Sequence, residues 1–341
     1  MFMRRCLRLA EDGLGRTRPN PLVGCVVVKE GRIISEGFHQ EYGHNHAERN
    51  ALLNFEFRIS NCEKADATAS KFNFQNSTLY VNLEPCSHHG KTPPCADLIV
   101  EKGIGRVVCC NDDPNPLVAG NGFRKLEEAG IEVVRHVLEE EGRELNRRFF
   151  TFMEQRRPYV ILKWAESADG FMAPDSLTEK TEADRLRNDS DGSVRDNKDS
   201  VKAYWLSTQE QNRLNHRWRT EEAAILVGSG TYLTDKPSLT PRHYLGPAPL
   251  PVVLDRRNRL TDVPSLWLHL HTATVEESLG ELYRQNVQSV IVEGGRQVLD
   301  AFIASGLYDE VRVLRSPVTL GGGLPAPEVP PTLPGRLIVV C

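Results

Sequence analysis

The sequence contains no long apolar segment, no strong excess of charge of one sign and few aromatic residues. Residues 1–10 include three arginines and lack the continuous apolar run that a signal peptide or membrane-spanning helix requires. The formal net charge is −4 and aromatic residues make up 7% of the chain, so we expect neither a basic track for phosphate backbones nor a set of stacking rings. The expected protein is cytoplasmic and binds neither membranes nor nucleic acid.

Cysteines are also too few to suggest a disulfide framework. The chain has eight cysteines in 341 residues, and in a reducing compartment such cysteines are core residues or metal ligands. Those that fall in apolar runs are expected in the core, namely Cys6, Cys25, Cys109 and Cys110. No chemical context is evident for Cys62 or Cys341, which leaves Cys86 and Cys95 as candidate metal ligands.

The length favours two domains of about 150 residues each. In the first half we expect a helix over 2–12, helices beginning near residues 46, 95 and 123, and strands at 23–28, 33–37, 77–83, 106–110 and 131–135. In the second half we expect strands at 159–165, 223–227, 251–254, 289–292 and 310–314. Strands that alternate with helices predict an α/β protein with covered sheets.

The domain boundary is predicted between residues 148 and 149. Residues 139–157 are charged and end in Arg-Arg-Pro, so we interpret them as a connecting helix and linker. Residues 171–203 are dense in charge and contain few large apolar side chains. We expect this segment to be a mobile insertion, because it can bury little surface.

The strongest chemical signal is His46-Ala47-Glu48, followed after a predicted strand by Cys86 and then Cys95. One imidazole and two thiolates suit zinc, and a set of three ligands leaves the fourth tetrahedral position open for water. Glu48 follows the histidine by two residues, where it can approach that water and move protons without being a ligand. We therefore predict His46, Cys86 and Cys95 as metal ligands and Glu48 as the catalytic acid and base.

Three stretches of the first half resemble a known family. Residues 83–95 are similar, nearly residue for residue, to the zinc loop of the riboflavin-biosynthesis deaminases, and residues 19–24 and 113–122 resemble two further segments of that family. The resemblance implies a cytidine-deaminase-like three-layer α/β/α fold that deaminates a 2,5-diaminopyrimidinone with a ribosylamino 5′-phosphate. Asn20 is expected to hydrogen-bond this substrate, with a purely structural role in its loop as the alternative.

The second half resembles the reductase domain of the same pathway, which has a dihydrofolate-reductase-like α/β fold. The resemblance rests on residues 163–170, on the Gly-rich turn 225–231 with 234–242, and on 291–295. It implies NADPH as cofactor, and the absence of a G-x-G-x-x-G fingerprint disfavours an ordinary Rossmann domain. The reduction would convert the ribosyl group of a small-molecule pyrimidine ribose phosphate to a ribityl chain.

The same resemblance carries site roles to individual positions. The residues implied to face the cofactor are Glu166, Trp205, Thr231, Asp235, Arg256 and Gly295. Those implied to face the substrate are Lys163, Ala203, Arg219, Leu239, Arg242 and Glu293. Arginines suit a phosphate, although Arg219 also lies in a cluster of arginines that is typical of a solvated helix face.

Two alternatives remain open. Ala203 replaces a usual serine and Lys236 a usual aspartate, so the second domain could be an inactive scaffold beside a working deaminase. A zinc-dependent nucleic-acid deaminase shares the metal chemistry, but it needs the basic track and aromatic side chains that this chain lacks. The sequence leaves the oligomeric state open, and a homo-oligomer is compatible with it.

Overall fold

The computed structural model divides the chain into two compact units, Met1–Arg157 and Pro158–Cys341. It describes residues 1–60, 74–88, 93–115, 119–174, 206–329 and 335–341. The boundary predicted after residue 148 lies inside helix α6 (Arg147–Gln155), which belongs to the first unit. The reason is burial: Phe149 and Phe150 of α6 pack against Leu83 in that unit.

The first unit is built on a five-stranded mixed sheet with the order β2-β1-β3-β4-β5. β1 pairs antiparallel with both neighbours, whereas β3, β4 and β5 run parallel. The strands are β1 (Gly24–Lys29), β2 (Arg32–Phe38), β3 (Thr78–Leu83), β4 (Arg106–Asn111) and β5 (Glu132–Val134). All five strands expected from the sequence are present.

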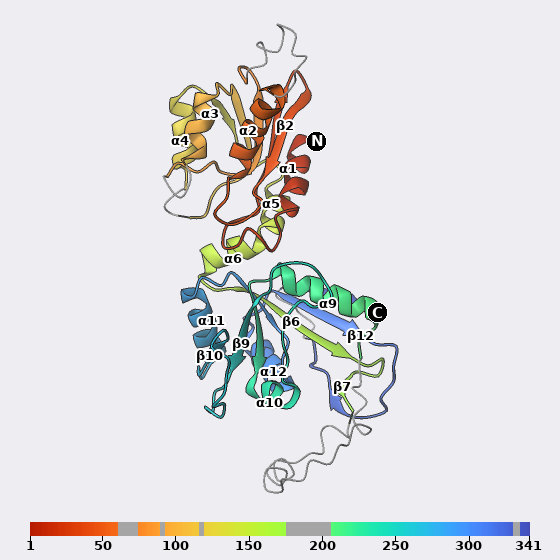
Figure 1. Ribbon diagram of the computed structural model, residues 1–341. Helices are drawn as coiled ribbons and strands as arrows, with labels where there is room; N and C mark the ends of the chain where they lie inside the picture. Colours follow the sequence, from red (N-terminus) through yellow and green to blue (C-terminus); the bar gives the residue numbers. More distant parts are fainter. Residues whose placement is uncertain (61–73, 89–92, 116–118, 175–205, 330–334) are drawn as a thin grey trace. The chain divides into compact units, whose positions relative to one another are not determined.

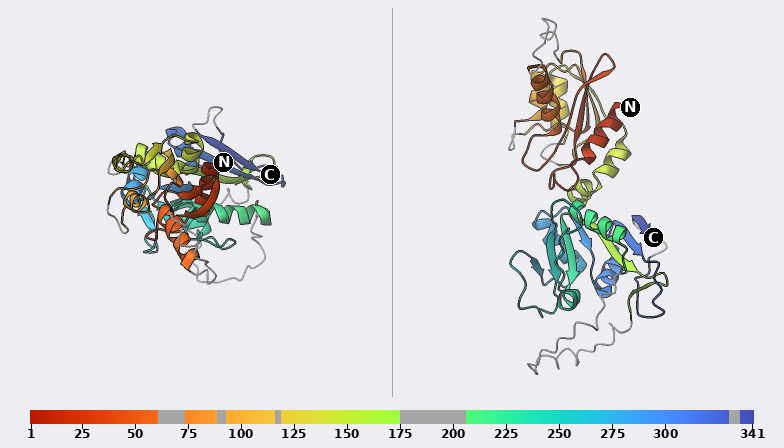
Figure 2. Two further views of the ribbon diagram at one scale, coloured as in Figure 1. Left: turned by 90° about the horizontal axis from the view of Figure 1, so that it is seen from above. Right: turned by 45° about the vertical axis from the view of Figure 1, so that its right-hand side comes forward.

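Side-chain alternation along β1 separates the two faces of this sheet. Cys25 and Val27 belong to the core under α2, α3 and α4, whereas Val26 and Val28 pack with α1 on the other face. The result is a layer of helices on each face (Figures 1 and 2). The helices are α1 (Phe2–Glu11), α2 (Ala47–Ser60), α3 (Cys95–Glu101), α4 (Asn121–Glu128) and α5 (Glu139–Leu145).

The second unit contains a seven-stranded sheet with the order β10-β9-β8-β11-β6-β12-β14, and every pair in it is parallel. The strands are β6 (Tyr159–Glu166), β8 (Ala224–Gly228), β9 (Leu250–Leu254), β10 (Leu268–Leu270), β11 (Ser289–Val292), β12 (Glu310–Arg315) and β14 (Arg336–Val340). Five were expected from the sequence; the short β10 and the half-exposed β14 were missed.

Helices cover both faces of this second sheet as well. In β6, Val160 and Leu162 face the core formed with α11 and α12, while Tyr159 and Ile161 face Trp218 of α9. Because a parallel sheet is buried on both faces, its strands are almost continuously apolar. The helices are α9 (Gln209–Glu221), α10 (Ser229–Asp235), α11 (Val275–Arg284) and α12 (Arg296–Ser305).

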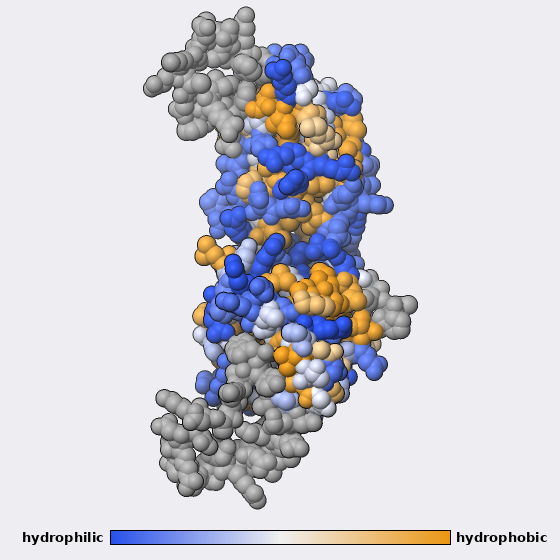
Figure 3. Space-filling view, turned by 90° about the vertical axis from the view of Figure 1, so that its right-hand side faces the viewer, coloured by the Kyte–Doolittle hydropathy of each residue, from blue (hydrophilic) through white to orange (hydrophobic). Residues whose placement is uncertain are grey.

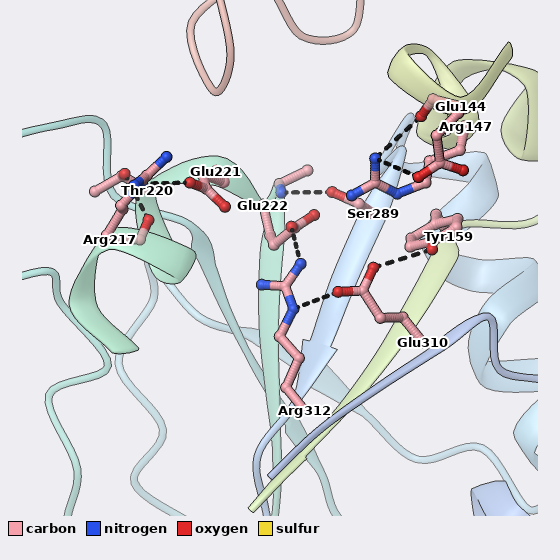
Figure 4. A network of polar contacts seen from close by, with 11 residues as sticks. Glu144, Arg147, Tyr159, Arg217, Thr220, Glu221, Glu222, Ser289, Glu310 and Arg312 are labelled. Atoms are coloured by element: carbon pink, nitrogen blue, oxygen red, sulfur yellow. Dashed lines mark hydrogen bonds and ion pairs between the residues drawn. The ribbon is translucent and has the colours of Figure 1, made fainter. Parts of the chain in front are cut away.

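A buried ionic network joins the amino-terminal ends of the strands in the second unit (Figure 4). The Arg312 guanidinium donates to Glu310 at 2.7 Å and to Glu222 at 3.4 Å, and it lies 4.9 Å from the centre of the Trp218 ring. Tyr159 donates its hydroxyl to Glu310 at 3.0 Å. The carboxylates and the guanidinium are almost inaccessible to solvent, so breaking one pair would leave a costly buried charge.

Two further expectations about the chain need correction. Residues 139–157 were expected to contain one connecting helix, but they contain two helices, α5 and α6, which meet at Asn146. The predicted insertion begins too early, because β7 (Phe171–Ala173) pairs with β13 (Leu324–Pro325). The rest of that predicted insertion, residues 175–203, lies outside the described residues.

The described residues on the face drawn in Figure 3 are mainly polar, with local apolar patches. Leu337 and Val339 on edge strand β14 are 47% and 42% exposed. Among the described residues, none of the helices is long and apolar enough to cross a membrane.

Replacing Phe302 tests whether the core of the second unit is packed as described. Phe302 is fully buried beneath the sheet, so Phe302→Ala is expected to lower the free energy of unfolding of this unit by about 3–5 kcal/mol. Denaturant titration followed by tryptophan fluorescence measures the change. Leu245→Ala is the control, since Leu245 is 99% exposed, and an equal effect of both variants would contradict the packing.

Candidate active sites

His46, Cys86 and Cys95 come together in the first unit as a potential metal centre. His46 Nδ1 lies 3.5 Å from the sulfur of Cys86 and 3.5 Å from that of Cys95. These separations are close to the ligand spacing around a tetrahedral zinc ion, for which Zn–S is about 2.3 Å and Zn–N about 2.0 Å. The three atoms therefore could hold a divalent ion and leave one position free.

Each ligand lies where a strand ends or a helix begins. His46 directly precedes α2 and its carbonyl accepts the Asn50 N–H at 3.0 Å. Cys86 follows β3, and Cys95 is the first residue of α3 after Pro94. The Cys95 N–H points to the sulfur of Cys86 at 3.4 Å, so a backbone dipole faces that sulfur.

The electrostatics of the two cysteines suit a cation. A hydrogen bond from Cys95 lowers the pKa of Cys86 to about 4, which makes Cys86 a thiolate at neutral pH. The same hydrogen bond and burial raise the pKa of Cys95. Thiolates are the form in which cysteine binds metals, so the donor set fits zinc.

Glu48 lies in the first turn of α2 and is only 3% exposed. Burial and the neighbouring Cys86 thiolate together raise the pKa of Glu48 to about 7. A carboxyl group with a pKa near neutrality can accept and return a proton. Glu48 is thus placed to exchange protons beside the metal ligands.

The Pro-Asn-Pro loop that carries Asn20 is held by two asparagine side chains that the sequence analysis did not single out. Asn82 accepts from the Gly24 N–H and donates to the Leu22 carbonyl, and Asn146 bonds both backbone groups of Leu22. All of these bonds are buried and span from 58 to 124 residues of sequence. They fix the loop next to β3.

His39, another residue not expected from the sequence, orients Asn20. The His39 Nδ1 lies 3.0 Å from the Asn45 carbonyl, so this nitrogen is the donor. Burial lowers the pKa of His39, which keeps the ring neutral and leaves Nε2 to accept from Asn20 Nδ2 at 3.0 Å. The Asn20 amide oxygen is therefore directed away from His39.

Glu84 holds the segment that leads into α4 beside the loop that carries Cys86. Its carboxylate accepts the backbone N–H groups of Asp113, Gly120 and Gly122 at 2.9 to 3.3 Å. A side chain at Gly122 would place its Cβ 2.0 Å from the Pro85 carbonyl oxygen. Glycine is required there because two backbone segments touch beside Cys86. His88 is exposed, and His89 lies outside the described residues.

In the second unit, Lys163, Arg219 and Glu293 form a buried charged cluster. Glu293 follows β11 and accepts from Arg219 at 2.7 Å and 3.3 Å, while Lys163 Nζ of β6 lies 3.9 Å away. The three side chains are 9% to 11% exposed. Arg219 is thus not a solvated helix residue, unlike the neighbouring Arg217, whose side chain is 55% exposed.

His216 extends this cluster, and the sequence analysis did not identify it. It lies one turn before Arg219 on α9, and its ring meets that of His243 edge-on with centres 4.6 Å apart. Burial and the positive charges of Arg219 and Arg242 together lower the pKa of His216 to about 4. The ring is neutral at pH 7, and its buried Nδ1 has no hydrogen-bond partner.

The predicted cofactor residues occupy several different places. Gly295 precedes α12 with φ of 62°, and a Cβ there would lie 3.2 Å from Thr231 Oγ1, so these two residues are adjacent. Gly294 is needed for close packing, because its Cβ would lie 2.7 Å from Val227 Cα. The Glu166 carboxylate is occupied by Trp164 and Arg315.

Among the described residues, no hydrogen bond or ion pair joins the remaining predicted positions to the Glu293 cluster. Leu239 is buried against Ile225 and Val227 with φ of 54°, while Asp235, Arg242 and Arg256 are exposed. Arg242 is linked to the cluster through its electrostatic effect on His216. Ala203 and Trp205 lie outside the described residues.

Two family models match the chain, one for each unit. Residues 1–111 match the cytidine and deoxycytidylate deaminase zinc-binding region, and residues 158–332 match the RibD C-terminal domain. The sequence and fold thus define a zinc-binding deaminase domain joined to a reductase domain.

Similar proteins confirm this arrangement over nearly the whole chain. The riboflavin biosynthesis protein RibD of Aquifex aeolicus is 37% identical over 95% of this chain, and that of Escherichia coli is 34% identical over 94% of this chain. Each comparison covers 88% of the relative. The solved structure of the Thermotoga maritima deaminase/reductase has a TM-score of 0.75 and is 36% identical. The solved structure of Acinetobacter baumannii RibD has a TM-score of 0.76 and is 31% identical. Each comparison covers 95% of this chain and 88% of the other. The chain belongs to the RibD family of riboflavin biosynthesis proteins and is a bifunctional deaminase and reductase.

Glu48→Gln tests the role of the buried carboxyl group. The amide cannot accept a proton, so we expect deamination to fall by about 100-fold or more while the metal content stays that of the parent chain. Ammonia release and elemental analysis are the two measurements. Glu41→Gln is the control because Glu41 is exposed; retained deamination in Glu48→Gln would remove Glu48 from the proton path.

Proposed function

We propose that the first unit deaminates 2,5-diamino-6-ribosylaminopyrimidinone 5′-phosphate and that the second unit reduces the product with NADPH. The observation that carries the proposal is the meeting of His46 with the sulfurs of Cys86 and Cys95 beside buried Glu48. The T. maritima protein, which the chain resembles along its length, is described as a diaminohydroxyphosphoribosylaminopyrimidine deaminase and 5-amino-6-(5-phosphoribosylamino)uracil reductase.

In the deaminase, His46, Cys86 and Cys95 are the zinc ligands. Zinc bound there supplies Lewis-acid activation of a water molecule. Glu48 transfers both protons of the attacking water, the first to the ring nitrogen and the second, from the new hydroxyl group on the ring carbon, to the amine, which leaves as ammonia while the ring carbon becomes a carbonyl. Its burial supports this role, because a desolvated carboxyl group gives the proton up as readily as it accepts it.

Asn20 orients the pyrimidine in this proposal. Since Asn20 Nδ2 donates to His39, the amide oxygen is the atom available to accept from an amino group of the substrate. The loop is held by Asn82 and Asn146, so little conformational entropy would be lost on binding.

In the reductase, NADPH supplies a hydride to the ribosyl carbon. The amino terminus of α12 after Gly295, with Thr231 beside it, suits the cofactor pyrophosphate, because helix amino termini present free N–H groups. We assign Glu166, Trp205, Asp235 and Arg256 to the cofactor and Ala203 and Leu239 to the substrate from the family resemblance alone.

The charged cluster suits the substrate phosphate and the opened sugar. Lys163 and Arg219 carry two positive charges against the single negative charge of Glu293, and exposed Arg242 adds a third. A net positive site of this kind attracts a phosphate, and the Arg219 guanidinium can bind it in a bidentate manner. Lys163 is placed to polarise the sugar oxygen or nitrogen that receives the proton.

Product analysis distinguishes this proposal from a chain whose second unit is a scaffold. The full chain is incubated with the diaminopyrimidinone phosphate, with and without NADPH, and the products are analysed by mass spectrometry. We expect the deaminated ribosyl compound without NADPH and the ribityl compound with it. Ammonia release without reduced product in the presence of NADPH would select the scaffold, and absence of both products would reject both assignments.

Arg219 and Arg217 provide a matched pair for the phosphate site. Both lie on α9, but only Arg219 reaches Glu293. Arg219→Gln is expected to raise the KM of the reductase substrate by about 10- to 100-fold, because a charge-assisted hydrogen bond contributes about 1.5–3 kcal/mol. Arg217→Gln is expected to leave KM unchanged, and circular dichroism checks that both variants are folded. Equal KM values in the two variants would place the phosphate elsewhere.

A further inference from the structure

A second group of potential metal ligands lies in the second unit, at the carboxyl ends of β9 and β10. It consists of Asp255, His269 and His271, whose candidate ligand atoms all lie within 4.8 Å of one another. Neither the deaminase site nor the proposed roles of the reductase residues use these side chains. They therefore require a separate explanation.

The strand register brings the three residues together. β9 and β10 are parallel, His269 is opposite Val253, and the Asp255 N–H continues the ladder by donating to the Leu270 carbonyl at 2.8 Å. Because side chains two residues apart share a face of a strand, His269 and His271 lie on one face with Asp255. The alternate residues of both strands, among them Val252 and Leu270, face the hydrophobic core.

Unpaired polar atoms point to a missing partner in this group. Asp255 is 0% exposed, and one carboxylate oxygen accepts the Leu260 N–H at 2.8 Å, whereas Oδ1 has no hydrogen-bond partner. His269 Nε2 is also buried without a hydrogen-bond partner and lies 3.5 Å from Asp255 Oδ2. A buried carboxylate is costly unless it is fully paired or coordinates a metal.

The donor chemistry identifies the class of ligand. Two imidazoles and one carboxylate form a common set for divalent transition metals, and they leave positions open for water. We propose that Asp255, His269 and His271 bind a divalent ion of the zinc and cobalt type, independently of the centre formed by the two cysteines. His271 is exposed, so an ion can reach the site.

Such an ion would join β10 to the loop that follows β9. Asp255 begins that loop and already holds Leu260 near its end. The His269 and His271 rings, with centres 4.1 Å apart, would share a ligand in addition to the contact of His271 Nδ1 with the Asp255 carbonyl at 3.3 Å. The expected consequence of metal binding is local order at the carboxyl ends of these two strands.

Cobalt distinguishes the two centres in one experiment, because only the first contains sulfur. The full chain is stripped with a chelator, titrated with Co²⁺, and examined by absorption spectroscopy and elemental analysis. We expect about two ions per chain, of which only one produces a thiolate-to-cobalt charge-transfer band. The His269→Ala/His271→Ala variant should bind about one ion and keep that band unchanged.

The same titration includes a control variant and has results that would contradict the proposal. His136→Ala is the matched control, since exposed His136 also lies near two carboxylates, 3.3 Å from Glu139 and 4.0 Å from Asp112, and this variant should keep both ions. A parent chain whose single bound ion gives the charge-transfer band, or a double variant that keeps both ions, would overturn the proposal. If only the sulfur centre fails, the parent chain binds cobalt without the charge-transfer band, which rejects the deaminase site and leaves this one intact.

If the double variant does not fold, a single substitution still tests the site. His271→Ala alone removes an exposed side chain, so it should not disturb the core. It is expected to weaken binding of the sulfur-free ion by about tenfold or more. Unchanged affinity in the folded single variant would overturn the assignment of His271.

Discussion

The first unit depends on three chain segments ending at one point, where an imidazole nitrogen and two sulfurs lie within 4.8 Å of one another. His46, Cys86 and Cys95 come from the start of α2, the end of β3 and the start of α3. The Cys95 N–H at the start of α3 points to the Cys86 sulfur, and this dipole favours the Cys86 thiolate. The centre therefore requires the sheet order that places β3 beside β1.

The surrounding polar residues serve to keep this point rigid. Glu84 gathers three backbone N–H groups from the segment before α4, and Asn82 and Asn146 hold the loop of Asn20. Buried polar groups of this kind are costly unless all of them are paired. Their pairing holds the segments around His46, Cys86 and Cys95 in fixed positions. Catalysis requires the reacting groups to be held in a defined geometry.

The second unit uses the same principle with charges instead of a metal. Glu293 lies at the carboxyl end of β11 between Arg219 and Lys163, and ligands of parallel α/β sheets bind at that edge. The opposite edge carries the closed network of Arg312 with Glu310 and Glu222. One end of the sheet thus holds a cluster with excess positive charge, while the other holds one guanidinium shared by two buried carboxylates.

The sequence predicted the layers, most strands and the meeting of His46, Cys86 and Cys95 at one point, because each depends on local pattern or on residue type. His39, Glu84 and His216 were missed, since their importance comes from partners distant in sequence or from burial. The domain boundary was misplaced because a charged segment contains the buried Phe149 and Phe150. Likewise, nothing local in the sequence shows that Arg315 occupies the Glu166 carboxylate.

The central claim is that a cation is held by two sulfurs and one imidazole in the first unit. X-ray absorption at the zinc edge tests it most directly, on the full chain loaded with a single equivalent of zinc. The account predicts a shell of about two sulfurs near 2.3 Å together with nitrogen or oxygen near 2.0 Å. A spectrum that contains only nitrogen and oxygen ligands would contradict it.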